Sequence, residues 1–205
     1  MRSLALTSTK GGVGKSTLAF NLSGALAGHL QPLVLVDEDI RIHTCLTWAG
    51  STVAGLDLNF RTVSPAQASA ATQDAAMLVV DTEGRPELPD LVALTGNFDR
   101  VLIPCGVSGV EVNSTIELWE LLGQAGADLS RVRVVITKAP PVGTLGQQAR
   151  EALRELGVSA CESVVRNYAA HQRAAELGML VRDVPDKRAL SAWADIEALA
   201  SEVLA

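Results

Sequence analysis

Short, almost wholly apolar runs alternate along the chain with longer stretches in which apolar residues recur every three or four positions. The short runs are typical of strands buried on both faces, and the longer stretches are typical of amphipathic helices. Strands are predicted at 3–8, 32–37, 56–63, 76–81, 100–104 and 132–137, with a last short strand within 157–165. Helices are predicted at 16–27, 65–73, 110–122, 146–156, 168–177 and 185–204.

This alternation of strands and helices predicts the fold class. Strands joined through helices pair in parallel by right-handed crossovers, so the pattern favours an α/β fold with a mostly parallel twisted sheet and helices on both faces. The chain has 205 residues, of which 48% are hydrophobic, which is enough for one sizeable core. Because no internal repeat or linker interrupts the pattern, we expect residues 1–205 to form a single domain.

Composition excludes several classes of protein. The net charge of −6 argues against a general nucleic-acid binder, although residues 131–188 hold ten Lys and Arg against six Asp and Glu. Three isolated cysteines without a CxxC pair argue against a disulfide framework or a zinc site. No apolar run approaches the roughly 18 residues of a membrane span, and the first residues lack a signal-peptide pattern. We therefore expect a cytoplasmic protein with no membrane partner.

A glycine-rich segment between the first predicted strand and helix carries the strongest chemical signal. Three glycines within residues 11–14 can adopt backbone angles closed to other residues, which lets successive N–H groups surround phosphate oxygens at the start of a helix. In such a loop the lysine reaches the β- and γ-phosphates and the following hydroxyl binds Mg²⁺. The segment predicts a site for ATP and Mg²⁺ formed by Gly11, Gly12, Val13, Gly14, Lys15, Ser16 and Thr17.

The start of this loop departs from the usual GxxxxGK[ST] pattern. Thr9 stands where the first glycine belongs, and Lys10 follows it. The stretch resembles the deviant Walker A motif of the ParA/MinD family, closest to short ParA-type partition proteins without an N-terminal helix-turn-helix domain. The resemblance implies a three-layer P-loop NTPase fold and a homodimer that forms on ATP binding. It also implies that Lys10 crosses the dimer interface to contact the partner's ATP.

Acidic residues end two of the predicted strands. Because the ends of parallel strands meet at one edge of the sheet, Asp37, Asp39 and Asp81 are expected beside the glycine-rich loop. The resemblance implies that Asp37 lies near Mg²⁺, that Asp39 positions the attacking water, and that Asp81 holds a Mg²⁺-bound water. In place of the family's usual Pro-Gln, the residues after Asp39 are Ile40 and Arg41.

The segment after Asp81 is atypical for the family, whose members usually have a small residue followed by proline. Here Thr82-Glu83-Gly84-Arg85-Pro86 follows, so we expect Glu83 or Arg85 to alter the hydrolysis rate or the coupling to a partner. No glutamine or arginine finger is evident in cis, so unaided hydrolysis is expected to be slow.

Three further polar residues carry weaker signals. By resemblance, Thr137 and Lys138 lie close to the adenine; a polar pair that merely ends a core strand is an equal alternative. His171 has no Cys, His or acidic partner at metal-site spacing, so we interpret it as a surface residue.

The resemblance also implies a biological role. Short ParA-type proteins are ATP-switched dimers that bind nucleoid DNA without sequence preference and segregate plasmids or chromosomes, with hydrolysis stimulated by a centromere-binding adaptor protein. DNA binding requires a basic surface. Candidates for it are Arg150, Arg154, Arg166, Arg173, Arg182, Lys187 and Arg188, although interleaved acidic residues are equally typical of an ordinary mixed-charge surface.

Four other functions share parts of this pattern. One is a MinD-like or other cargo-positioning ATPase; its membrane-switch form needs a basic amphipathic C-terminal helix, but residues 189–205 contain three acids and no Lys or Arg. An iron–sulfur carrier needs cluster cysteines, which three isolated cysteines do not supply. A metabolic ATP-dependent ligase would have a small-molecule pocket and turn over without DNA. A nucleotide-binding scaffold with little hydrolysis is suggested by the atypical segment at Glu83 and Gly84.

Overall fold

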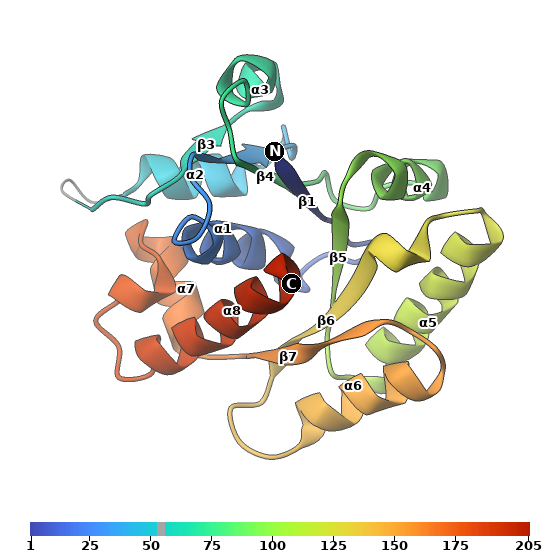
Figure 1. Cartoon of the computed structure of the whole chain (residues 1–205). Helices are drawn as coiled ribbons and strands as arrows, with labels where there is room; N and C mark the ends of the chain where they lie inside the picture. The colour runs from blue at the N-terminus through green and yellow to red at the C-terminus, as the bar shows by residue number, and fades with distance from the viewer. Residues whose placement is uncertain (53–55) are drawn as a thin grey trace.

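The strands form one parallel sheet in the order β3-β2-β4-β1-β5-β6-β7 (Figure 1). The computed structural model describes residues 1–52 and 56–205. The strands are β1 Arg2–Leu6, β2 Leu33–Asp37, β3 Arg61–Val63, β4 Met77–Asp81, β5 Arg100–Cys105, β6 Val132–Ala139 and β7 Ala160–Arg166. The helices are α1 Lys15–Leu26, α2 Thr44–Gly50, α3 Pro65–Ala71, α4 Leu88–Asn97, α5 Gly109–Gln124, α6 Leu145–Glu155, α7 Ala169–Leu177 and α8 Ala189–Leu204.

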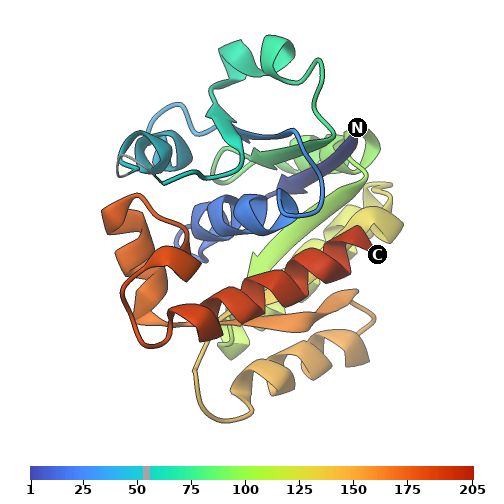
Figure 2. The same ribbon diagram turned by 60° about the vertical axis from the view of Figure 1, so that its left-hand side comes forward.

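Helices cover both faces of the sheet, as the buried apolar runs require. On one face, alternate strand residues such as Leu4 and Leu35 pack against α1 and α8, with α2 and α7 beside them (Figure 2). On the other face, residues such as Val101 and Val134 pack against α4, α5 and α6, and α3 covers the β2–β3 edge. The predicted three-layer α/β fold is therefore confirmed.

The order of the strands places the glycine-rich loop at the middle of the sheet, on the side where the carboxyl ends of the strands lie. The chain leaves β1 toward α1, and β1 lies between β4 and β5, so successive crossovers go to opposite sides of it. In open parallel sheets a crevice forms at such a point, outside the carboxyl ends of the strands. Asp37 and Asp81 are the last residues of β2 and β4, which are adjacent strands, and the two are paired in register at the same edge.

Most predicted elements are present, and three differences have physical causes. The predicted strand 56–63 contains only β3, Arg61–Val63, because Asp57 and Asn59 form a turn in which the Asp57 carboxylate accepts the Asn59 N–H. Helix α4 was not predicted, and prolines at positions 86 and 89 are residues that usually interrupt a helix. Pro89 instead lies in its first turn, where a proline is tolerated, and Glu87 and Asp90 cap it. Helix α2 was also missed, as a seven-residue segment with a weak apolar period.

Helix α2 is fixed in place by aromatic packing against α1 and by a hydrogen bond to the segment after α7. Trp48 stacks on Phe20 of α1 with ring centroids 4.3 Å apart, and its Nε1–H donates to the Met179 carbonyl at 3.0 Å. The end of α2 also packs closely on the turn after α7: a Cβ at Gly178 would lie 2.4 Å from the Ser51 backbone. The segment after β2 is thereby fixed to both α1 and the α7 end.

Candidate nucleotide site

The glycine-rich loop presents unpaired backbone donors at the start of α1. Gly14, at the helix N-cap, has φ of 87°, and Gly12 has φ of 76°, both in the left-handed region that favours glycine. In the part of the chain that the structure describes no side chain caps the helix, so its first N–H groups remain available to a ligand. The loop lines a cavity of about 580 Å³, together with Asp39, Arg41, Glu83 and Arg85 from the segments after β2 and β4.

Lys15 points across this cavity to the end of β4. Its Nζ donates to Asp81 Oδ1 and to the Thr82 carbonyl, each at 2.5 Å. The other carboxylate oxygen of Asp81 accepts a hydrogen bond from the buried Cys45 thiol at 3.4 Å. Asp81 is fully buried, and Lys15 and Cys45 together compensate its charge.

Asp37 lies beside Asp81 and is also fully buried. Its carboxylate accepts the backbone N–H groups of Asp39, at 3.2 Å, and of Leu46, at 3.0 Å. Burial raises the pKa of Asp37, with the Asp81 charge adding to the effect, although these hydrogen bonds oppose it. A divalent cation at this edge would relieve the repulsion between the two carboxylates.

The residues at this edge fit Mg²⁺. Ser16, Asp37 and Asp81 supply hydroxyl and carboxylate oxygens, which are the donors that this ion prefers. Within residues 1–52 and 56–205 no group of three or more His, Cys, Asp or Glu side chains could hold a metal. An ion here would therefore depend on the Ser16 hydroxyl and on phosphate and water oxygens as well as on the two acids.

Asp39 and Lys10 line the same cavity. Asp39 is half-buried, and its Oδ1 accepts the N–H groups of Arg41 and Ile42 at 3.2 and 3.1 Å, which forms a tight turn after β2. Lys10 lies at the rim, where its Nζ donates to the Val110 carbonyl in the first turn of α5 at 3.2 Å. The structure thus brings together Lys10, Lys15, Asp37, Asp39 and Asp81, as the sequence predicted for one edge of the sheet.

A second cavity of about 630 Å³ adjoins the first and shares Gly14, Thr17 and Lys138 with it. Thr137 is buried, and its hydroxyl donates to the Val13 carbonyl at 2.9 Å, so this residue holds the glycine-rich loop against β6. The volume and position suit the nucleoside part of a nucleotide. Its outer wall consists of residues that the sequence reasoning did not place there: Arg166, Asn167, Tyr168, His171 and Gln172.

His171 differs from the sequence interpretation as a surface residue. Both ring nitrogens are buried and lack a hydrogen-bond partner among the described residues. Burial lowers the pKa of His171, because the charged imidazolium is disfavoured away from water. The interpretation as a surface residue was wrong because α7 packs against α8, and nothing in the local sequence indicates that packing.

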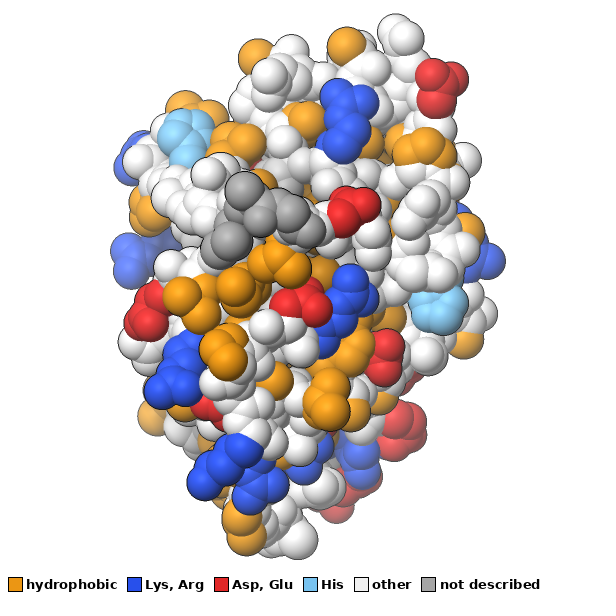
Figure 3. All heavy atoms as spheres, turned by 90° about the vertical axis from the view of Figure 1, so that its left-hand side faces the viewer, with side chains coloured by type: hydrophobic (Ala, Val, Ile, Leu, Met, Phe, Trp, Pro, Cys, Tyr) orange, Lys and Arg blue, Asp and Glu red, His pale blue; other side chains and the backbone are white. Residues whose placement is uncertain are grey.

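The candidate DNA-binding residues do not form one uncompensated patch. Five of the seven make ion pairs: Arg150 and Arg154 with Glu162, Arg166 with Asp195, Arg173 with Asp186, and Arg182 with Asp183. Lys187 and Arg188 are exposed and make no side-chain ion pair in the described part of the chain. Figure 3 likewise shows basic, acidic and apolar side chains interspersed on the face that carries α2 and α7.

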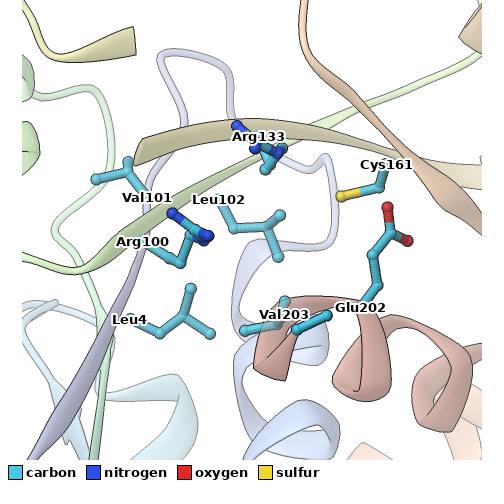
Figure 4. A pocket seen from close by; sticks show the side chains of 9 residues that line it. Leu4, Arg100, Val101, Leu102, Arg133, Cys161, Glu202 and Val203 are labelled. Carbon is cyan, nitrogen blue, oxygen red and sulfur yellow. The ribbon is translucent and has the colours of Figure 1, made fainter. Parts of the chain in front are cut away.

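A separate cavity of about 340 Å³ lies at the opposite edge of the sheet, under the end of α8 (Figure 4). The polar residues that line it are Arg100, Arg133, Cys161 and Glu202. Burial raises the pKa of the Cys161 thiol to about 12, with the Glu202 charge adding to the effect. Glu202 accepts the backbone N–H groups of Glu162 and Ser163, so it ties α8 to β7 far from the glycine-rich loop.

Known proteins share this sequence pattern over most of the chain. Residues 4–181 match the CobQ/CobB/MinD/ParA nucleotide binding domain. The chain belongs to this family. ParA/MinD-type proteins are ATPases, and the chain is one of them by its family match and its fold. In the described residues no helix is long and apolar enough to cross a membrane.

Individual relatives support the same assignment. The chain is 32% identical to the maintenance of carboxysome distribution protein A of Gloeobacter kilaueensis, over 98% of this chain and 94% of the relative. The MinD cell division protein of Aquifex aeolicus superposes with a TM-score of 0.73 at 16% identity, covering 100% and 97% of the two chains. A ParA family ATPase from Chlorobium tepidum superposes with a TM-score of 0.70 at 16% identity, covering 98% of each chain. Both solved structures thus share the fold of this family member.

Proposed function

We propose that this chain is an ATP-dependent, dimerising ATPase that positions a large cargo in the cell. One observation carries the proposal. The glycine-rich loop, with Gly12 and Gly14 at positive φ, leads into α1, and Lys15 lies beside Asp37 and Asp81, which end the adjacent strands β2 and β4 in register. When ATP arrives, the backbone N–H groups bind its phosphates and Lys15 moves from Asp81 to the β- and γ-phosphates. Bound Mg²⁺ would neutralise phosphate charge, and Ser16, Asp37 and Asp81 would hold it through oxygen atoms.

Asp39 is the residue we assign to the attacking water. It is half-buried, lines the phosphate cavity, and has its Oδ1 held by two backbone N–H groups, so the carboxylate is oriented before ATP binds. We expect Asp39→Ala to reduce kcat by about 10²-fold with little change in nucleotide affinity, because positioning groups act on the chemical step. An Asp39→Ala protein that hydrolyses ATP at the wild-type rate would remove this assignment.

Dimerisation is proposed from the place of Lys10 at the rim of the cavity. Among the described residues its ammonium donates to the Val110 carbonyl alone, so it can leave α5 for the phosphates of a second copy's nucleotide. In sedimentation experiments, the wild-type chain should dimerise with a slowly hydrolysed ATP analogue but not with ADP. Lys10→Ala should stay monomeric in both, while the control variant Lys187→Ala behaves as wild type. An unchanged monomer for the wild type would refute the proposal.

DNA is the proposed surface over which the dimer acts. Because most of the basic candidates are ion-paired, we assign the phosphate contacts first to Lys187 and Arg188, which a dimer would double. A double variant, Lys187→Ala with Arg188→Ala, should weaken binding to DNA of any sequence and reduce its salt dependence. Arg173→Ala, which removes a cation already paired with Asp186, is the matched control and should have a smaller effect.

Two kinds of cargo are consistent with the family. The relative named for carboxysome distribution favours a protein assembly as cargo. The resemblance of the sequence to short ParA-type proteins favours plasmid or chromosome partition through a centromere-binding adaptor. Deleting the gene separates them: plasmid loss or chromosome missegregation supports partition, whereas clustering of a protein assembly with normal DNA inheritance supports assembly positioning.

A membrane-bound cycle of the MinD type is not favoured. The apolar side of α8, including Trp193, Ile196 and Leu199, is buried against α1 and the sheet, so it is not available to a lipid surface. The helix also lacks the Lys and Arg residues that attract anionic lipids. We therefore propose that the ATP-bound dimer associates with the nucleoid.

A further inference from the structure

The atypical segment after β4 is attached to both ends of the glycine-rich loop. The Thr82 carbonyl accepts a hydrogen bond from Lys15, and the Arg85 N–H donates to the Ser8 carbonyl at 3.3 Å. Arg85 itself has φ of 59°, in the left-handed region. Because β4 lies between β2 and β1, this segment lies beside the glycine-rich loop and the segment after β2.

Five cations line the phosphate cavity, and most already have a partner. Lys15 is paired with Asp81, Arg41 is paired with Glu83 at 3.9 Å, and the Nζ of Lys10 donates to a carbonyl. Among the described residues, Arg85 and Lys138 make neither an ion pair nor a side-chain hydrogen bond. Two guanidinium or ammonium groups thus remain for a ligand in this cavity.

These two cations lie at different ends of the nucleotide site. Lys138 also lines the second cavity, where the nucleoside is expected, and its side chain lies against Gly14. Arg85 lines only the phosphate cavity, next to the residues that hold Lys15. Because the lysine of such a loop reaches the β- and γ-phosphates, Arg85 lies at the end of the cavity that receives the terminal phosphate.

Although the sequence pattern alone indicates no arginine finger in cis, we propose that Arg85 is a catalytic arginine supplied in cis, which contacts the γ-phosphate of the ATP bound by its own chain. This rests on the proposed ATPase function. In the reaction, a bond forms between the water oxygen and the γ-phosphorus while the bond to the β-phosphate oxygen breaks, giving ADP, inorganic phosphate and a proton. Negative charge spreads over the γ-phosphate oxygens in the transition state. A guanidinium stabilises that charge without giving or taking a proton.

The neighbouring Glu83 has a complementary role in this assignment. By pairing with Arg41 at 3.9 Å, it partly offsets the charge of the other arginine of the cavity and joins the segment after β2 to the segment after β4. Both side chains of this pair are highly exposed, so water and salt weaken it. Arg85 is therefore the arginine whose charge is least compensated next to the terminal phosphate.

The test compares Arg85→Ala and Arg85→Lys with Arg61→Ala, an exposed arginine on β3 outside both cavities. For Arg85→Ala we expect kcat to fall by about 10²-fold and KM to change by less than about threefold. Fluorescence titration should show unchanged affinity for ADP·Mg²⁺ but weaker affinity for ADP·Mg²⁺ with aluminium fluoride, which mimics the transferred phosphoryl group. Arg85→Lys should restore part of both losses, and Arg61→Ala should match the wild type.

Mixing experiments decide whether the arginine acts in cis. Arg85→Ala protein is combined with Lys15→Met protein, so that a mixed dimer contains one intact Lys15 in the Arg85→Ala subunit and Arg85 only in its partner. No recovery of hydrolysis is expected for a residue that acts in cis, whereas recovery would overturn the assignment. Sedimentation with an ATP analogue should show that Arg85→Ala still dimerises.

Besides recovery on mixing, three outcomes would overturn the proposal: a wild-type kcat for Arg85→Ala, an equal loss of affinity for ADP·Mg²⁺ with and without aluminium fluoride, or loss of dimerisation. Arg85→Gln, which keeps most of the side-chain volume, repeats the measurement if the alanine variant melts early. A wild-type chain that binds or hydrolyses no ATP would instead refute the proposed function, so the two failures are distinguishable.

Discussion

Substituting Arg166 should lower the stability of the fold, although the sequence favours this residue as a DNA contact. Its guanidinium makes a two-point contact with Asp195 of α8: Nε donates to Oδ2 at 2.9 Å and Nη2 donates to Oδ1 at 2.5 Å. Asp195 is only 8% exposed, and in Arg166→Ala its carboxylate would keep only the backbone N–H of residue 166, at 3.0 Å. The variant therefore leaves the buried carboxylate of Asp195 with a single hydrogen-bond donor among the described residues.

The size of the effect follows from this geometry. Breaking a buried ion pair by removing one partner costs about 3–5 kcal/mol. The Arg166 side chain is 38% exposed, so screening by water reduces the loss to roughly 2–3 kcal/mol. For a chain of this size about 1 kcal/mol corresponds to roughly 2–4 °C, so we expect Tm to fall by roughly 4–12 °C.

Thermal and urea denaturation would measure this loss. Arg188→Ala is the matched control, because it removes an exposed arginine whose side chain makes no ion pair in the described part of the chain. Asp195→Asn combined with Arg166→Ala completes a double-mutant cycle, in which the two losses should not add. If Arg166→Ala melts with the wild-type Tm, the pair contributes nothing and the reasoning is wrong. A weakened gel shift for this variant would report on DNA binding only at temperatures where the fold is intact.

Further predictions concern the turn after α7, pH and the thiols. Gly178→Ala should cost more than about 2 kcal/mol in urea denaturation, because the residue has φ of 65° and a Cβ would meet the Ser51 backbone at 2.4 Å; wild-type stability would contradict the close packing. Burial lowers the pKa of His171 below its ordinary 6.5 in the folded chain, so the unfolded chain binds the proton more readily. The contribution of the neutral ring to the stability of the fold is therefore complete above pH 6.5 and is lost as the pH falls below that value. A plot of unfolding free energy against pH should therefore drop below 6.5 in the wild type and be flatter there in His171→Gln; equal slopes would contradict this. Iodoacetamide at pH 8 should label none of the three buried cysteines in the native chain and all three after unfolding, since burial raises each thiol pKa; rapid native labelling would show that α2 or α8 opens.

The sheet and the phosphate loop could be predicted from the sequence because their signals are local. Buried strands such as 33–37 are continuous apolar runs, and the glycines of the loop are adjacent to Lys15 and Ser16 in the chain. The strand-end acids were also predictable, since parallel strands bring their ends to one edge. These patterns need no knowledge of distant contacts.

The missed features depend on contacts between segments far apart in the chain. The thiol of Cys45 reaches Asp81, and the guanidinium of Arg166 is paired by Asp195, and neither contact has a spacing signal in the sequence. The second cavity depends on how α7 packs beside the loop at Val13 and Gly14, so its wall residues could not be recognised from the order of residues alone. The same holds for Arg85, whose sequence context identified an unusual segment without indicating which way its cation lies.

The contact between Lys15 and Asp81 also bears on which nucleotides the chain would accept. A ligand that draws the ammonium away must supply at least as much negative charge at the same point as the fully buried carboxylate that holds it. ADP and ATP carry phosphates at that point, whereas AMP and adenosine do not. The contact between Lys15 and Asp81 would thus act as a selectivity threshold, and AMP would have to bind with Lys15 still directed at Asp81.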